Sequence, residues 1–231
     1  MKVIEQLVAQ ALKEMKAEEP AAFVKPKEET YGVFATMDEA IEASAKAQKT
    51  LLFSKIEDRQ RYVDIIRATI LRRENLELIS RMAVEETAIG KYEHKLIKNR
   101  LAAEKTPGTE DLVTEAQTGD HGLTLVEYCP FGVIGAITPT TNPTETIICN
   151  SISMIAGGNT VVFSPHPRAK KSTIEAAKVV LEAAVKAGAP EGIVGWIDIP
   201  NLELTNTLMA ESDIILATGG PGMVKAAYSS G

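Results

Sequence analysis

The feature that most constrains the fold is a regular alternation of strand-like and helix-like segments from Gly132 onward. Short apolar runs predict buried strands, and each run is followed by apolar residues at the spacing of a helix. Four strand–helix units in succession predict an α/β fold with a doubly wound parallel sheet and right-handed crossovers. The predicted strands are Gly132–Ile137, Thr160–Phe163, Ile193–Ile197 and Ile214–Ala217, and the predicted helices lie near Pro143–Ala156, Lys171–Ala187, Leu202–Ala210 and Met223–Ser229.

The segment that precedes this alternation is predicted to be helical. Thr36 with Glu39, and Ser54 with Glu57, match the S/T-x-x-E pattern of a capping box, which marks the start of a helix. The predicted helices cover Met37–Leu51, Lys55–Arg72, Asn75–Ala88 and Lys91–Ala103. Near residues 112–128, two strand-like runs flank Gly119-Asp120-His121-Gly122, which predicts a β-hairpin with His121 as a polar turn residue.

Residues 1–18 predict a separate amphipathic helix. Apolar residues recur at helical spacing from Val3 to Met15, and charged residues take the opposite face. Residues 19–30 contain two prolines and several charges, which predicts a linker to a main domain at 31–231. The helix either packs on its own domain or docks on another protein, and the pattern alone favours the first alternative.

Composition excludes several classes of function. The net charge of −6 gives no basic field for nucleic acid or acidic membranes. The two cysteines, Cys129 and Cys149, have no paired spacing, which argues against a disulfide framework or a metal site. Polar residues interrupt the most apolar region, and Glu5 and Gln6 leave no signal-peptide core. We therefore expect a soluble cytoplasmic protein with no membrane partner.

Three loops that follow predicted strands have unusual chemistry. They are TPTTNP (138–143), SPHPRA (164–169) and TGGPG (218–222). Parallel strands bring all three loops to the carboxyl edge of the sheet, where α/β folds bind ligands. Together they offer hydroxyls, an amide, an imidazole and glycine backbone near helix N-termini, which suits a ligand that carries phosphate.

Each loop is weak evidence by itself. Asn142, followed by Pro143 and Glu145, is a good helix N-cap, and capping could be its whole role. His166 stands between two prolines and is typical of a rigid loop. The glycines at 219–222 do not complete a dinucleotide-binding fingerprint, because Lys225 replaces the last glycine. The prediction depends on the three loops lying together.

The run TGDHGLTLVEYCPFGVIGAITPTTNPTETIICNSISMIAGGNTVVFSPHP and the later ATGGPGMVKAA resemble the CoA-acylating aldehyde dehydrogenases, including the propionaldehyde, butyraldehyde and acetaldehyde enzymes of bacterial microcompartments. The resemblance covers residues 31–231 and implies the Rossmann-like cofactor-binding part of that fold, with the hairpin in its oligomerisation element. Such enzymes oxidise an aldehyde with NAD through a cysteine, and coenzyme A then takes the acyl group.

The resemblance also implies roles for individual residues. Asn142 matches the asparagine of the oxyanion hole, whose N–H stabilises charge on the aldehyde oxygen. The implied cofactor-binding residues are Thr138, Pro139 and Thr140 on the nicotinamide side, Ser164, His166 and Pro167 around the adenosine, Thr218, Gly219 and Gly220 facing the pyrophosphate, and in addition Ile137 and Val224.

One departure from the superfamily pattern is informative. The hydrolytic branch has Lys-Pro-x-Glu after the second strand, and its glutamate holds the adenosine ribose. Here the loop is Ser-Pro-His-Pro, without a carboxylate. The 3′-phosphate of coenzyme A would then meet no negative charge, so we expect NAD and coenzyme A to alternate in one groove, as a ping-pong reaction requires.

The resemblance changes the reading of residues 1–18, which are similar to the encapsulation peptides that dock such enzymes on microcompartment shell proteins. It also implies a homo-oligomer, and later sequence that pairs with the hairpin and carries the nucleophilic cysteine. Neither Cys129 nor Cys149 matches that cysteine, so the 231-residue chain is predicted to be inactive alone. The alternatives are a non-catalytic nucleotide-binding module, a microcompartment cargo or assembly element, and a hydrolytic aldehyde dehydrogenase. The sequence does not predict the aldehyde's chain length or a preference between NAD and NADP.

Overall fold

A computed structural model describes residues 32, 34 and 36–230 of the chain. The predicted helix at 1–18 and the predicted linker at 19–30 lie outside the described residues. Every predicted helix and strand from residue 36 onward is present, and its ends agree with the prediction to within two residues. None of the helices in the described part of the chain combines the length and the apolar composition that crossing a bilayer requires.

The central sheet is parallel and has four strands in the order β5-β4-β3-β6. The strands are β3 (Val133–Ile137), β4 (Thr160–Ser164), β5 (Val194–Trp196) and β6 (Ile214–Ala217). In register, Ile134 of β3 pairs with Val161 of β4 on one side and with Ile214 of β6 on the other. The chain therefore proceeds from β3 outward to β5 and then returns to the far side of β3. This reversal between β3 and β6 is the point at which α/β sheets bind ligands.

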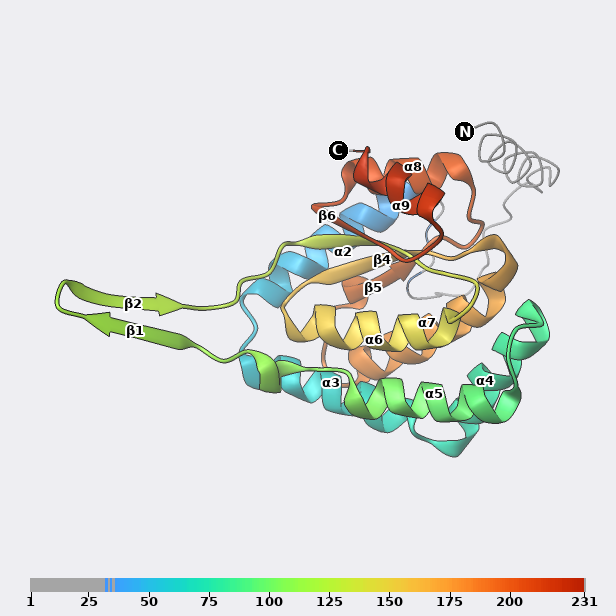
Figure 1. Cartoon of the computed structure of the whole chain (residues 1–231), viewed down its shortest axis with the longest axis horizontal. Helices are drawn as coiled ribbons and strands as arrows, with labels where there is room; N and C mark the ends of the chain where they lie inside the picture. Colours follow the sequence, from blue (N-terminus) through green and yellow to red (C-terminus); the bar gives the residue numbers. More distant parts are fainter. Residues whose placement is uncertain (1–31, 33, 35, 231) are drawn as a thin grey trace.

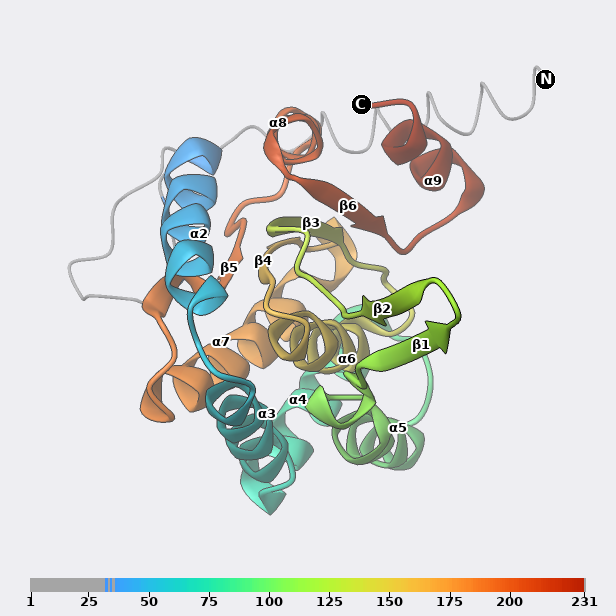
Figure 2. The same cartoon turned by 90° about the vertical axis from the view of Figure 1, so that its left-hand side faces the viewer.

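Helices cover the sheet in layers (Figures 1 and 2). On one face, α6 (Pro143–Ala156) and α7 (Lys170–Lys186) pack against the sheet, and α3 (Ile56–Ile70), α4 (Arg73–Thr87) and α5 (Tyr92–Lys105) form a layer outside them. On the other side lie α2 (Met37–Leu52), α8 (Leu202–Glu211) and α9 (Pro221–Tyr228). Three short 3₁₀ turns occur at Thr109–Asp111, Pro167–Ala169 and Glu191–Ile193.

The core lies between the sheet and the α6–α7 layer. All residues of β3, β4 and β5 are buried, because helices cover both faces of these strands. Helix α6 is buried along most of its surface, as expected for a helix enclosed between the sheet and α5. The largest side chains of this core include Phe163, Trp196, Ile147, Ile148, Ile152, Ile155 and Leu181.

The predicted hairpin extends away from this body (Figure 1). Strands β1 (Glu115–Gly119) and β2 (Gly122–Val126) pair antiparallel around the predicted turn, with Gly119 opposite Gly122. All residues of both strands are exposed to solvent. The hairpin is thus held together by its own ladder of hydrogen bonds, and within the described chain it has no core to cover.

The two predicted capping boxes have different outcomes. Thr36 caps α2, because its Oγ1 accepts a hydrogen bond from the Glu39 backbone N–H at 3.2 Å. The prediction for Ser54 was wrong. The hydroxyl of Ser54 donates instead to the Leu51 carbonyl at 2.6 Å, and the N-cap position is Lys55, whose backbone N–H donates to the Asp58 carboxylate at 3.2 Å. The Ser54 hydroxyl is bound to a carbonyl at the end of α2 and is therefore not available to cap α3.

Candidate functional site

A groove of about 520 Å³ lies at the carboxyl edge of the parallel sheet, where the chain leaves the neighbouring strands β3 and β6. The three predicted loops meet there, so the topology brings together the residues that the sequence singled out. The groove is lined by ten of the predicted residues, Ile137, Thr138, Pro139, Thr140, Ser164, His166, Pro167, Thr218, Gly219 and Gly220.

Two predicted residues lie elsewhere. Val224 sits on α9 with 46% of its surface exposed and is outside the groove lining, so the structure does not bring it to the site. Asn142 lies at the N-terminus of α6, directly after Thr141 of the groove wall. Its side chain is half-buried.

The sequence reasoning missed a fourth loop. The connection from β5 to α8 also reaches this edge, and it contributes Pro200, Asn201 and Leu202 to the lining. The signal was available, because a strand predicted at 193–197 in a parallel sheet must end at the same edge. Thr141 and Pro165, which belong to two of the predicted loops, also line the groove, as do Thr205 and Met223, which the sequence reasoning missed.

Hydrogen bonds tie the polar groups beneath the groove to one another. The Thr138 backbone N–H donates to the Ser164 carbonyl at 3.1 Å. The Ser164 and Thr205 hydroxyls are 3.0 Å apart, and Thr205 also donates to the Asn201 carbonyl at 2.8 Å. Asn201 in turn caps α8 by accepting from the Leu204 backbone N–H at 2.8 Å. The three loops after β3, β4 and β5 are therefore locked in one arrangement before any ligand binds.

His166 presents a neutral imidazole to the groove. Its Nδ1 accepts a hydrogen bond from the Arg168 backbone N–H at 3.1 Å, so the ring proton is on Nε2. Burial lowers the pKa of this imidazole below its usual value, and the positive charge of Arg168 lowers it further. Near neutral pH the ring is therefore an uncharged hydrogen-bond donor.

The glycine turn leaves backbone open at the start of α9. Gly220 is the N-cap of α9, and no described side chain caps this helix end. A Cβ built on Gly220 would meet no described atom within 4 Å, so another molecule can approach the backbone closely. Unpaired N–H groups and the helix dipole favour an anion at such an end. The turn can therefore accept a phosphate group of a ligand.

Asn142 occupies the N-cap position of α6, but its side chain makes no capping hydrogen bond to the described backbone. The alternative that capping is its whole role is therefore not supported. Its Oδ1 instead accepts a hydrogen bond from Lys98 Nζ, which comes from α5. A buried ion pair lies beside this contact, with Lys95 Nζ 3.1 Å from Glu145 Oε1. Helix α5 of the outer helix layer thus holds the side chain of the asparagine through Lys98.

The two cysteines lie apart from the described groove. Cys129 is exposed. Cys149 is half-buried, and its Sγ accepts a hydrogen bond from the Thr106 hydroxyl at 3.1 Å.

Comparison with known proteins gives the family. A model of the "Aldehyde dehydrogenase family" matches residues 8–229. This chain belongs to the aldehyde dehydrogenase family. A CoA-propanoylating propanal dehydrogenase of Salmonella typhimurium is 42% identical over 205 residues, which cover 87% of this chain and 43% of that protein. An acetylating acetaldehyde dehydrogenase from the same organism is 39% identical over 227 residues, covering 97% of this chain and 47% of that protein.

Solved structures of propionaldehyde dehydrogenases share the fold. A propionaldehyde dehydrogenase of Rhodopseudomonas palustris, with bound CoA and an acylated cysteine, has 58% identity and a TM-score of 0.84, covering 87% of this chain and 46% of that one. A propionaldehyde dehydrogenase from a fucose utilisation microcompartment of Clostridium phytofermentans has 51% identity and a TM-score of 0.83 over the same 87%. The chain spans less than half the length of these relatives.

Proposed function

We propose that this chain is the cofactor-binding portion of a CoA-acylating aldehyde dehydrogenase that oxidises a short-chain aldehyde to its acyl-CoA. The observation that carries the proposal is the groove at the reversal between β3 and β6, where all three predicted loops meet beside an asparagine that does not cap its helix. In such an enzyme NAD accepts the hydride and coenzyme A accepts the acyl group. The nucleophilic cysteine is proposed to come from sequence outside these 231 residues.

The groove offers what these cofactors need. The open backbone at Gly219 and Gly220 suits a pyrophosphate at the N-terminus of α9. Ser164, His166 and Pro167 are proposed to contact the adenosine portion, and Thr138, Pro139 and Thr140 the nicotinamide portion. The walls are largely apolar, with a few polar groups already fixed by hydrogen bonds, as is usual for a cofactor site.

Asn142 is proposed to supply the oxyanion donor. Its Oδ1 is engaged by Lys98, while its Nδ2 has no hydrogen-bond partner within residues 36–230. An unengaged amide N–H₂ beside the groove is what a developing negative charge on the aldehyde oxygen requires.

NAD and coenzyme A are proposed to alternate in the same groove. The Ser164-Pro165-His166-Pro167 loop carries no carboxylate, and its imidazole is neutral, so a phosphate at this end meets no repulsion. The acylating relatives, one with CoA bound, favour this branch over the hydrolytic alternative.

The test is a fluorescence titration of this chain with NADH, repeated at rising concentrations of coenzyme A. We expect saturable NADH binding that coenzyme A displaces competitively. Simultaneous binding of both ligands to one chain would contradict the shared groove. Absence of binding by either ligand would contradict the assignment of the three loops.

A variant pair sharpens the titration. Pro167→Glu places a carboxylate at the position where the hydrolytic branch has its glutamate. We expect this variant to weaken the binding of coenzyme A about tenfold or more, because the carboxylate repels the 3′-phosphate. Repulsion of roughly 1.4 kcal/mol at a partly screened site corresponds to this factor. NADH binding should weaken less. Pro167→Gln removes the same proline without adding charge and is the matched control.

The same titration and an enzyme assay separate the non-catalytic alternative. A nucleotide-binding module would bind NADH but would not depend on Asn142. In an enzyme that carries this chain together with a catalytic domain, Asn142→Ala should lower kcat by about 10²–10³ if the residue is an oxyanion donor. An unchanged kcat would mean that Asn142 is not the oxyanion donor, whereas an absence of turnover in that enzyme would favour the binding module.

Residues 1–18 are proposed to dock the enzyme on a microcompartment shell protein. The support is their amphipathic pattern together with the microcompartment origin of one similar structure. Deletion of residues 1–18 should abolish co-localisation with shell protein and leave thermal stability unchanged. If the deletion lowers thermal stability and leaves co-localisation intact, the helix packs on its own domain.

The exposed hairpin supports a homo-oligomer. Leu123 and Leu125 project from one face of β2 and are 61% and 60% exposed, which is unfavourable unless another surface covers them. We propose that a second copy of the protein provides this surface.

A further inference from the structure

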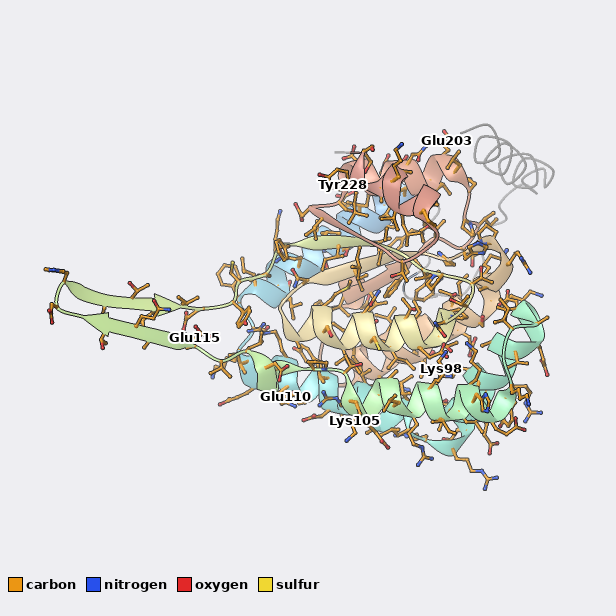
Figure 3. All side chains as sticks on the ribbon, viewed as in Figure 1. Lys98, Lys105, Glu110, Glu115, Glu203 and Tyr228 are labelled. Carbon is orange, nitrogen blue, oxygen red and sulfur yellow. The ribbon has the colours of Figure 1, made fainter. Side chains whose placement is uncertain are left out.

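We infer that Lys98 is a positioning residue for the reaction, because it fixes the amide of Asn142 with its N–H₂ group free to meet the substrate oxygen. This inference rests on the proposed oxyanion role of Asn142. The observation is the hydrogen bond from Lys98 Nζ to Asn142 Oδ1, which joins α5 to the N-terminus of α6 across 44 residues of sequence. Figure 3 labels Lys98 on α5.

An amide can present either its oxygen or its nitrogen to a partner, and only the nitrogen carries donors. Lysine has donors and no acceptor, so it can hold only the amide oxygen. With Oδ1 held by Lys98, the two N–H bonds of Asn142 point away from the ammonium group. Within the described chain they have no other partner. Lys98 thus selects the one amide orientation that can stabilise an oxyanion.

Without Lys98, the amide oxygen of Asn142 could instead form a hydrogen bond that caps its own helix. Asn142 occupies an N-cap position, where asparagine normally accepts a hydrogen bond from a backbone N–H of the first helical turn. That rotamer would turn the side chain over the helix end and away from its present place. Because Lys98 binds the amide oxygen, this oxygen is not available for the capping hydrogen bond to the first turn of α6.

The lysine is itself held in place. Lys98 Nζ lies 3.5 Å from Glu145 Oε1, and the same carboxylate pairs with the buried Lys95. Lys95 Nζ also donates to the Thr141 carbonyl at 2.7 Å, which anchors the loop just before Asn142. Loop backbone and amide side chain are therefore both attached to α5.

The charges of this cluster favour the same role. Two ammonium groups surround one carboxylate, so the cluster of Lys95, Lys98 and Glu145 carries a net positive charge beside the amide. A positive charge behind the amide oxygen polarises its N–H bonds and stabilises negative charge that develops in front of them.

The test is a double-mutant cycle in the complete enzyme that carries this chain. Lys98→Met should lower kcat roughly tenfold, with little change in KM, since it removes an interaction that acts in the transition state. Lys98→Arg keeps a cationic donor and should recover most of the rate. In an Asn142→Ala background, Lys98→Met should have no further effect, because the amide that it positions is gone.

A control variant lies on the same helix. Lys105, labelled in Figure 3, is an exposed lysine at the end of α5 without a described contact to the site. Lys105→Met removes the same charge, and we expect an unchanged kcat. A loss equal to that of Lys98→Met would mean that only the net charge matters, which would overturn the positioning role.

The outcomes also separate this inference from the proposed function. If Asn142→Ala lowers kcat strongly while Lys98→Met does not, the oxyanion role stands and the positioning role is wrong. If Asn142→Ala has no effect, both are wrong. Equal losses from Lys98→Met with and without Asn142 would show that the lysine acts through something else.

A second measurement needs no activity. In ¹⁵N-labelled 231-residue chain, the Asn142 side-chain amide is assigned by its loss in Asn142→Asp. Lys98→Met should shift this signal, Lys98→Arg should shift it less, and Lys105→Met should leave it unchanged. Thermal unfolding of each variant excludes a general loss of fold. If Lys98→Met leaves the chemical shifts of the Asn142 side-chain amide unchanged, the contact on which the inference depends is not present.

Discussion

The parallel sheet and the β-hairpin are built from the same kind of backbone ladder but have opposite environments. The strands β3 and β4 are buried along their whole length, whereas β1 and β2 are exposed along theirs. The parallel strands are continuous apolar runs, because helices cover both faces. In the hairpin, Leu123 and Leu125 lie on one face of β2 and Thr124 lies on the other with Val126, so the leucine face is the more apolar one.

This difference indicates what each sheet is for. Strands β3, β4 and β5 of the parallel sheet are buried by the described chain, and the sheet brings four loops to one edge. The hairpin has an apolar face that no described part of the chain covers. Substitutions in the sheet should therefore act on stability, and substitutions in the hairpin should act on association.

The largest expected effect is at the centre of the parallel sheet. Phe163 is fully buried in β4 between β3 and β5. Phe163→Ala should lower the free energy of unfolding by about 3–5 kcal/mol through lost burial and a cavity. Urea denaturation followed by circular dichroism measures this loss. Phe163→Leu, which keeps most of the volume, is the control, and an equal loss in both would argue against a cavity effect.

A somewhat smaller loss is expected beside the edge of the sheet. Lys95→Met leaves the Glu145 carboxylate buried without its closest partner and should destabilise the chain by about 3 kcal/mol, at the low end because Lys98 remains nearby. The double variant Lys95→Met/Glu145→Gln should be more stable than Lys95→Met alone, as measured by the same denaturation. If the double variant is the less stable of the two, the ion pair is not what the lysine contributes.

The hairpin should respond in the opposite way. Leu123→Ser/Leu125→Ser should change the free energy of unfolding of the monomer by no more than about 0.5 kcal/mol, because both side chains are exposed there. It should, however, shift the sedimentation velocity profile toward smaller species. Thr124→Ser, on the opposite face, is the control. An unchanged profile in the double variant would mean that the hairpin does not mediate association.

The smallest effect concerns the pH dependence of stability at the groove. The pKa of His166 is lowered in the folded chain by burial and by Arg168, so the unfolded chain binds the proton more readily. Stability should be unaffected above the unfolded pKa of about 6.5 and should fall as pH drops below it. Thermal unfolding at pH 7.5 and 5.5 should show a larger drop for the wild-type chain than for His166→Asn. Equal drops would mean that His166 is not held neutral.

Much of the site could be predicted because it depends on topology. Alternating strands and helices imply a parallel sheet, and a parallel sheet places its strand-to-helix loops at one edge. Ten of the predicted residues meet in the groove for this reason. The loop after β5 was missed because its residues, Pro200 and Asn201, carry no chemistry that stands out in the sequence, although the same rule places them there.

The capping box predicted at Ser54 is absent, and the capping role left open for Asn142 is not observed, because in each case another group binds the side chain. Ser54 and Asn142 both stand at positions typical of a helix cap. The Ser54 hydroxyl is taken by the end of the preceding helix, and the Asn142 oxygen by a lysine of α5. A local sequence pattern does not show that another group, brought close by the fold, will bind the side chain first predicted to cap the helix.

The sequence by itself determined the order of the helices and strands, the parallel sheet and the edge at which its loops gather, because periodicity and turn residues record burial along the chain. Only the tertiary structure decided which groups surround those loops. The packing of α5 on α6 brings Lys95 and Lys98 to Glu145 and Asn142. These contacts cross more than 40 residues, and their geometry depends on how two helices pack, which no spacing in the sequence encodes.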